Sequence, residues 1–329
     1  MNFDTIKLDK GLYTSAKGFT KSLEEIDPSE NYIGTELEGL DAYERQLKRF
    51  NIKVSGKESD TVSKFFETSD SAVLFPEYLA RAIRVGLSNN ILDDLVATTT
   101  VIDSLDYRSI ECVDNGDEID PNGRINEGAF IPETYVKTKE NLTQLHKNGR
   151  MLVASYEAIK TQKLDLFTVS LKQIGNRIAQ CEAAQALQTL TANAKALKYG
   201  TTKAITYSDF IDLWKTLSPY EMNTVVAESG MIGNILQLAE FKDANAGQNF
   251  HGTGELVTPL GAKLIYSHSG VLGDGVLALD KRYALEKVQL GDVVTDFDKL
   301  IDRQLERATV TCTSGFNTIL SDASAIIKS

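Results

Sequence analysis

The chain has 329 residues, of which 42% are hydrophobic and 25% are charged, so it has enough apolar mass for one large core or two to three smaller ones. Its formal net charge of −11 argues against a dedicated nucleic-acid binder, because neutralising phosphates requires clustered Lys and Arg. No apolar run follows a basic N-terminal segment and no stretch approaches the roughly 20 apolar residues that span a bilayer, so we expect neither a signal peptide nor a membrane protein.

The three cysteines, Cys112, Cys181 and Cys312, are an odd number without CxxC spacing. Such a pattern predicts reduced thiols in a protein that is made and folded in the cytoplasm.

Residues 1–72 are polar and rich in turn-forming residues. One helix is expected at 35–50, where Leu37, Leu40 and Leu47 repeat at helical spacing. We interpret this segment as an arm that packs on something else, or as a partly disordered leader. A chain that lacks residues 1–60 should therefore still fold.

A helix is predicted to begin at Phe75, with Pro76 in its first turn, where the missing N–H costs nothing. Residues 98–110 alternate and are rich in β-branched side chains, which predicts a strand. Dense turn residues follow at 114–124, and a second strand returns at 134–139. The two strands predict a long two-stranded flap.

The longest helix is predicted at 164–191, where Leu164, Leu171, Ile174 and Ile178 lie on one apolar stripe. At 1.5 Å per residue such a helix is about 40 Å long and spans most of a domain. A shorter helix is expected before it, at 151–159.

A second region begins near residue 206, with a helix at 209–217 capped by Ser208. The sequence then predicts a strand at 223–228, a helix at 232–241, a glycine-rich stretch at 247–261 and strands at 263–266 and 275–280. The segments 304–314 and 323–328 are expected to be long edge strands. The chain as a whole is predicted to be an α+β protein.

Residues 118–129 partly match a calcium-binding loop through Asp120, Asn122 and Gly123. Glu118 and Ala129 stand where the pattern needs Asp and a bidentate Glu, so a polar hairpin tip explains the segment better. A calcium-dependent binding protein remains the alternative from another functional class.

Other motifs of catalysis or ligand binding are incomplete. Gly254 and Gly261 are spaced too widely for a phosphate loop that ends at Lys263. The segment 270–275 reads as a turn between strands. His146, His251 and His268 lie near no second ligand at zinc spacing. We assign no catalytic, cofactor-binding or metal-binding residue and expect no cofactor.

Three charged residues on the return strand of the flap, Lys137, Lys139 and Glu140, have two open interpretations. They form a solvated face, or they pair with a neighbouring subunit.

Several stretches resemble the tailed-bacteriophage major capsid family, which has the Hong Kong phage capsid fold. Val153-Ala-Ser-Tyr-Glu-Ala-Ile-Lys is similar to the family's element before the spine helix, and Ile174-Gly-Asn-Arg-Ile-Ala is similar to the spine itself. Gly275-Val-Leu-Ala-Leu-Asp resembles the strand after the axial region, and Ala325-Ile-Ile-Lys is a common family ending. The order of these elements over residues 70–329 carries the resemblance.

The resemblance implies an N-terminal arm at 1–72, an extended loop at 111–148 and an axial domain at 205–286. The peripheral domain would combine 73–110, 149–204 with the spine helix, and 287–329 with the return strands.

A major capsid protein self-assembles as hexamers and pentamers into an icosahedral shell, the virion head, which encloses double-stranded DNA without sequence-specific binding. Its expected partners are further copies of itself, a scaffold or maturation protease, a portal and head-completion proteins. Counting back from the family ending puts Glu306 near the Asn that some members use for covalent cross-linking, so we expect no cross-link. The closest alternative is an encapsulin-like nanocompartment shell.

Overall fold

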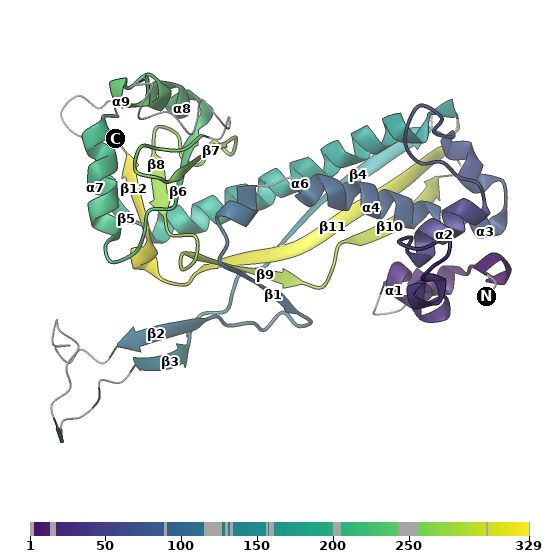
Figure 1. The fold of residues 1–329 in the computed structure, drawn as a ribbon, viewed down its shortest axis with the longest axis horizontal. Coiled ribbons are helices and arrows are strands. Elements are labelled where there is room, and N and C mark those ends of the chain that lie inside the picture. Colours follow the sequence, from purple (N-terminus) through teal and green to yellow (C-terminus); the bar gives the residue numbers. More distant parts are fainter. Residues whose placement is uncertain are drawn as a thin grey trace. The chain divides into compact units, whose positions relative to one another are not determined.

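The computed structural model of the chain divides into two compact units (Figure 1). Unit 1 combines residues 1–89, 149–179 and 293–312, and unit 2 combines 90–148, 180–292 and 313–329. The residues described are 3–13, 18–88, 91–114, 127–128, 131, 134–155, 157, 161–199, 205–242, 256–300 and 302–328.

The N-terminal part of unit 1 consists of short helices. They are η1 (Phe3–Thr5), η2 (Lys10–Tyr13), α1 (Phe19–Ile26), η3 (Ser29–Tyr32), α2 (Ala42–Arg49), η4 (Val62–Phe66) and α3 (Ser69–Ala72). The helix predicted at 35–50 is shorter, because Gly39 has a φ of 82° and Asp41 caps α2 by accepting the Glu44 N–H. Helix α1 was not predicted.

Apolar residues of this N-terminal part belong to the core of unit 1. Leu23 and Phe65 are fully buried, and Tyr43 and Leu47 are nearly so, together with residues of α4 (Phe75–Ser88) and α6 (Leu164–Asn193). Removing residues 1–60 would expose their partners in that core. This burial argues against the expectation that the chain folds without residues 1–60, which stays a prediction for a truncated protein.

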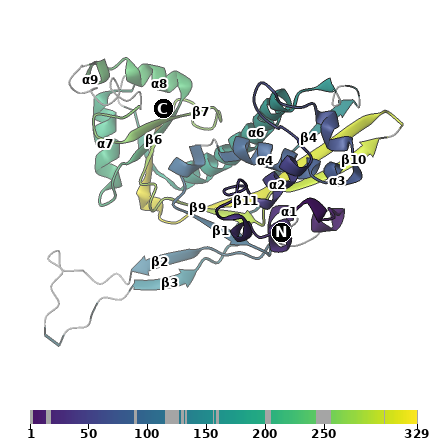
Figure 2. The same ribbon diagram turned by 45° about the vertical axis from the view of Figure 1, so that its right-hand side comes forward.

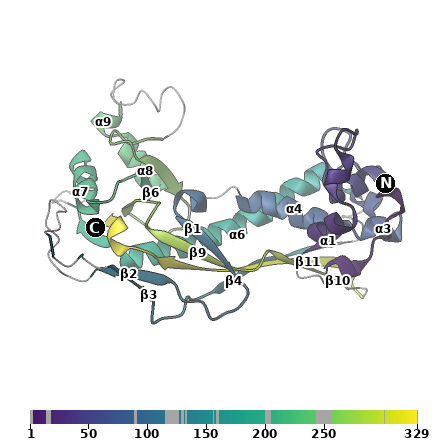
Figure 3. The ribbon, with the colours of Figure 1, turned by 60° about the horizontal axis from the view of Figure 1, so that its bottom comes forward.

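Helices α4 and α6 confirm the two predicted helices, and they lie side by side in Figures 1, 2 and 3. The predicted stripe faces the core, where Leu171 and Ile178 are buried. The Tyr78 hydroxyl donates a 2.7 Å hydrogen bond to the Leu164 carbonyl and ties α4 to the start of α6. Among the described residues, no helix combines the length and apolar character that a membrane span needs.

The helix predicted at 151–159 is wrong over residues 151–155, which end strand β4 (His146–Ser155). Glu157 is helical, and residues 156, 158 and 159 lie outside the described part of the chain. Leu152 and Ala154 pack against the core of unit 1, while Met151 and Val153 are half exposed. This alternation has the period of a strand, and β4 pairs with β11 (Leu305–Thr318).

Strand β11 is internal rather than an edge strand, which corrects the prediction. In unit 1 it pairs antiparallel with β10 (Val294–Leu300). In unit 2 its last residues pair antiparallel with β9 (Leu285–Leu290), and β9 pairs in parallel with β1 (Thr98–Ile102). Glu182 of α6 binds this part of the sheet, with Lys287 Nζ at 3.0 Å and Ser314 Oγ at 2.6 Å.

A second five-stranded sheet lies wholly within unit 2, in the order β5-β12-β8-β6-β7. Its strands are β5 (Lys195–Lys198), β12 (Ser324–Lys328), β8 (Val276–Leu279), β6 (Thr224–Glu228) and β7 (Lys263–Ser267). Strand β12 lies between β5 and β8, so it is not an edge strand either. Its Ala325, Ile326 and Ile327 are buried, which explains why this run is apolar.

Short helices accompany this sheet. They are α7 (Tyr207–Leu217), α8 (Ser229–Leu236), α9 (Ala239–Lys242), η5 (Ile91–Asp94) and η6 (Ser321–Ala323). The cap of α7 is Thr206, paired with Asp209 in a capping box, and not Ser208. The single helix predicted at 232–241 is two helices, α8 and α9.

A two-stranded flap is present as a separate sheet, but its first strand is not the predicted 98–110, because residues 98–102 form β1 and pair with β9. Strand β2 (Ile110–Asp114) pairs antiparallel with β3 (Thr134–Thr138), with Ile110 opposite Thr138.

Candidate assembly surface

The base of the β2–β3 flap is held by a buried carboxylate. Glu286 of β9 is only 5% exposed and accepts hydrogen bonds from Thr100 Oγ1 at 2.7 Å and Tyr107 OH at 2.6 Å. Ser109 Oγ donates to its second oxygen. Three hydroxyls thus compensate the loss of water around one carboxylate. Burial, followed by the hydrogen bond to Glu286, raises the pKa of Tyr107.

The chain returning from β3 is fixed at the same place. The Lys139 N–H donates to the Ser109 carbonyl at 2.8 Å, and the Thr143 N–H donates to the Tyr107 carbonyl at 2.9 Å. Gly315 of β11 lets this segment pass closely, since a Cβ there would overlap the Gln144 carbonyl oxygen. Both ends of the flap are therefore bound to the rest of unit 2.

The flap and its connections carry many exposed apolar side chains. Their exposed fractions run from 43% to 70%, and the residues are Val101, Leu105, Ile110, Ile131, Tyr135, Val136 and Leu142. Scattered apolar residues on a surface are normal, whereas a concentration in one segment is typical of an interaction site. A surface of this kind, on an anchored two-stranded sheet, suits docking on another protein.

The charged residues of the return strand have different surroundings. Lys139 is partly buried, and its Nζ donates to the Thr318 carbonyl within the subunit. Lys137 is exposed, with its Nζ 5.8 Å from the centre of the Tyr135 ring. Lys137 and the exposed Glu140 keep both interpretations.

A pocket in unit 2 lies at the C-terminal end of α7. Its lining includes Trp214, Tyr220, Met222, Asn223 and Leu260. Asn223 Nδ2 already donates to Asp280 at 2.7 Å. Burial opposes ionisation of Asp280, but hydrogen bonds from Arg282, Asn223 and backbone N–H groups hold its pKa below the usual value. This polar group is satisfied within the subunit and serves the fold.

The motifs considered in the sequence do not converge on one site in the described residues. The calcium-like segment lies outside them except for Glu127 and Gly128. Lys263 begins β7 and pairs with Asp94 at 2.7 Å, and residues 270–275 are a turn between β7 and β8, as predicted. His251 is not described, and among the described residues no three metal-ligating side chains of His, Cys, Asp or Glu gather.

Sequence reasoning missed Glu286 and its hydroxyl partners. The only available signal was a glutamate in a strand and the hydroxyl pair Tyr107 and Ser109 at period 2. The contact joins positions 177 and more residues apart, which no local pattern reveals.

Comparison with known proteins places these features in a family. A sequence model of the family described as "Phage capsid protein" matches residues 138–304, about half of the chain. No curated protein sequence matches the chain.

Three solved structures have a similar fold. A virus-like particle from Pyrococcus furiosus has a TM-score of 0.52 at 11% identity, covering 77% of this chain and 98% of that one. The capsid of cyanophage P-SCSP1u has a TM-score of 0.52 at 13% identity, covering 73% and 88%. The SrpI encapsulin complex from Synechococcus elongatus has a TM-score of 0.50 at 13% identity, covering 74% and 88%. Identities this low establish the fold alone, which is the mixed α+β Hong Kong phage capsid fold.

Proposed function

The chain belongs to the phage capsid protein family, and from this premise we propose that it is the major capsid protein of a tailed bacteriophage or prophage. The family resemblance expected from the sequence is confirmed. A phage capsid protein is a shell-forming component of the virion and not an enzyme. In the proposed function, copies assemble in the host cytoplasm as hexamers and pentamers into an icosahedral head that encloses double-stranded DNA.

The observation that carries this proposal is the anchored, apolar flap. A shell subunit needs surfaces that meet copies of itself, and contacts between unlike surfaces that close into rings give hexamers and pentamers. The half-exposed Ile110, Tyr135 and Val136 would lose contact with water on a neighbouring copy. Glu286 fixes the flap before docking, which lowers the entropy lost on assembly.

The division into domains follows the same proposal. Residues 1–72 form the N-terminal arm, here folded as short helices, and residues 111–148 form the extended loop. The peripheral domain takes 73–110, 149–204 and 287–329, and the axial domain takes 205–286. A scaffold or maturation protease, a portal and head-completion proteins are the further partners. Because Glu306 stands near the family's cross-linking Asn, the subunits are held together without covalent bonds.

A nanocompartment shell is the alternative with the same fold. The similar structures include a cyanophage capsid and an encapsulin, so the fold does not separate the two functions. The phage capsid family favours the phage head. Particles that co-purify with DNA and tail proteins would support the phage head, and particles filled with an enzyme would contradict it.

A pair of matched variants tests the flap. Val136→Asp places a charge on the exposed face of β3, where Val136 is 63% exposed, so the subunit should still fold but fail to form shells. Val294→Asp makes the same change at a 54% exposed position of β10 and should leave assembly intact. Electron microscopy with light scattering measures both. Normal shells from Val136→Asp would contradict the role of the flap.

A further inference from the structure

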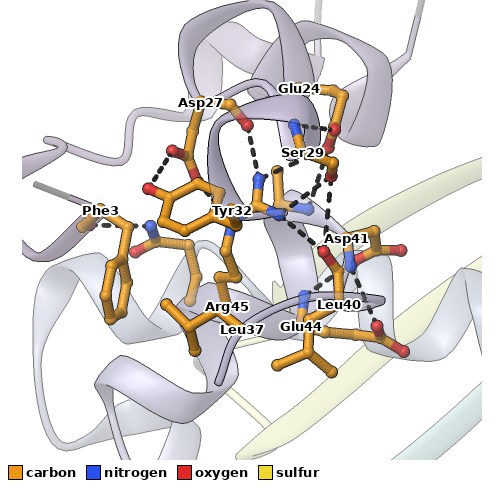
Figure 4. A network of polar contacts seen from close by, with 12 residues as sticks. Phe3, Glu24, Asp27, Ser29, Tyr32, Leu37, Leu40, Asp41, Glu44 and Arg45 are labelled. Carbon is orange, nitrogen blue, oxygen red and sulfur yellow. Dashed lines mark hydrogen bonds and ion pairs between the residues drawn. The ribbon is translucent and has the colours of Figure 1, made fainter. Parts of the chain in front are cut away.

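The N-terminal module, which we define as residues 3–13 and 18–72, has a buried charged centre (Figure 4). Arg45 of α2 is fully buried, with its Nε 2.7 Å from Asp27 Oδ2. Its Nη1 donates to the Leu40 carbonyl at 2.6 Å and to Ser29 Oγ at 2.9 Å. A buried guanidinium is tolerated only when its donors are paired, and here every partner comes from the module itself.

Tyr32 completes this centre. Its hydroxyl donates to Asp27 Oδ1 at 2.6 Å, and the Arg45 guanidinium carbon lies 4.3 Å from the centre of the Tyr32 ring. The network joins α1, η3 and α2, so residues 19–49 have a specific fold and do not form an extended arm.

A second network attaches the module to α4, a helix that pairs with the long helix α6. Glu77 of α4 is 4% exposed and accepts a 2.8 Å hydrogen bond from Thr20 Oγ1 of the module. The Glu77 N–H donates to the Tyr13 hydroxyl at 3.0 Å, and that hydroxyl donates to the Val73 carbonyl.

Arg81 of α4 is the main connection in this network. Its guanidinium lies 2.7 Å from the Asp41 carboxylate and 3.1 Å from Glu77. Its Nη2 donates to Thr20 Oγ1 at 3.0 Å, and its carbon lies 4.3 Å from the Tyr43 ring centre. Without the module, Glu77 would lose Thr20 and Arg81 would lose Asp41 and Tyr43, leaving a buried carboxylate with fewer partners.

Aromatic rings in the core of unit 1 also attach the module to α4. The ring of Phe65 lies 5.5 Å from that of Phe75 and 5.4 Å from that of Tyr78, the two aromatic residues at the start of α4. Phe75 and Tyr78 in turn pack on Phe167 of α6. A cut that released the module would open this core to water.

We propose that the N-terminal module is a permanent part of the subunit and stays uncleaved in the mature particle. The inference about the mature particle rests on the proposed function, whereas the inference about the unassembled subunit does not.

Intact-mass measurement on DNA-filled particles tests whether the module stays uncleaved in the mature particle. The chain from the particles should have the same mass as the chain of the unassembled protein. Chains from the particles that have lost any of residues 3–72 would overturn the proposal, because contacts of the module such as those of Tyr13 and Thr20 would be gone. A failure to form particles would count against the proposed function and leave the decision to the next experiment.

Limited thermolysin digestion of the unassembled protein tests the attachment. The wild-type module should be cut no faster than the rest of unit 1, since cleavage needs a shared opening. Arg81→Met should raise the cleavage rate within the module about tenfold or more, through the loss of charge-assisted hydrogen bonds. Arg303→Met, at a 73% exposed side chain, is the matched control and should change nothing.

The wild-type digestion is decisive even if Arg81→Met fails to fold. Rapid loss of the module that leaves the rest of the chain folded, as judged by circular dichroism, would overturn the proposal. Joint resistance of the module and unit 1 supports it.

Discussion

Gly175 of α6 lies directly against Gly86 of α4. A Cβ added at Gly175 would come within 3.0 Å of the Gly86 Cα and would overlap the Ile83 carbonyl oxygen. In the other direction, a Cβ at Gly86 would overlap the Lys172 carbonyl oxygen. The two helices of unit 1 thus touch through their backbones, and only glycine fits at the crossing.

Because of this contact, we expect Gly175→Ala to change stability in the opposite direction from an ordinary Gly→Ala substitution in a helix. Gly→Ala within a helix normally stabilises by about 0.5–1 kcal/mol, but Gly175→Ala should destabilise the protein by about 1–3 kcal/mol because backbone atoms must move. Gly233→Ala in α8, where a Cβ would meet nothing within 4 Å, should show the normal sign. Urea unfolding of both variants measures the difference, and a stabilised Gly175→Ala protein would contradict the crossing.

The apolar stripe of α6 predicts a contrast between two leucines on one helix. Leu171 is fully buried, so Leu171→Ala should lower the free energy of unfolding by about 2–5 kcal/mol. Leu166 is 61% exposed, and Leu166→Ala should change it by about 0.5 kcal/mol or less. Equal effects in thermal and urea unfolding would show that the stripe does not face the core.

Because Glu286 holds the base of the flap, we expect its substitution to speed amide hydrogen exchange near that base only. Glu286→Gln puts an amide NH₂ where a carboxylate oxygen accepts hydroxyl hydrogen bonds, so it should weaken the base and speed amide hydrogen exchange at residues 107–111 and 139–143. Exchange in the second sheet of unit 2 should stay unchanged. The control is Glu221→Gln, which alters a 74% exposed side chain. Unchanged exchange at the base in Glu286→Gln would remove Glu286 from this role.

Burial of tyrosines predicts a loss of stability in alkali. Burial raises the pKa of Tyr78 from 10 to about 12, against the opposing hydrogen bond with Thr168. Because the folded state favours the neutral phenol, this contribution is complete below pH 10 and is lost as the pH rises from 10 to 12. Urea midpoints across this range should fall, and the fall should be less steep in Tyr78→Phe. An identical slope in wild type and variant would refute the assignment.

Sequence patterns predicted those helices and strands in which the spacing of the apolar residues fits only one type of element. The stripe from Leu164 to Ile178 predicted α6, and the return strand at 134–139 predicted β3, both close to the observed bounds. The single strand predicted at 98–110 is instead β1 over 98–102, and β2 begins only at Ile110. The helix prediction for 151–155 was wrong because the apolar run there fits both a helical and a strand spacing. Pairing with β11 stabilises the strand.

Long-range contacts explain what the sequence left hidden. The apolar residues of the N-terminal module are sparse, yet Leu23, Tyr43 and Phe65 meet in one core with α4, and Arg45 is buried against Asp27. A polar, turn-rich composition cannot reveal that its charges neutralise each other inside the fold. The anchoring of the flap by Glu286 was hidden for the same reason.

Electron microscopy with light scattering on the purified protein tests the central claim most directly. The account predicts closed shells, capsomer rings or tubes of megadalton mass. A chain that stays a monomer of 36.2 kDa at high concentration, with its neighbouring gene products present, would contradict the assignment as a capsid protein.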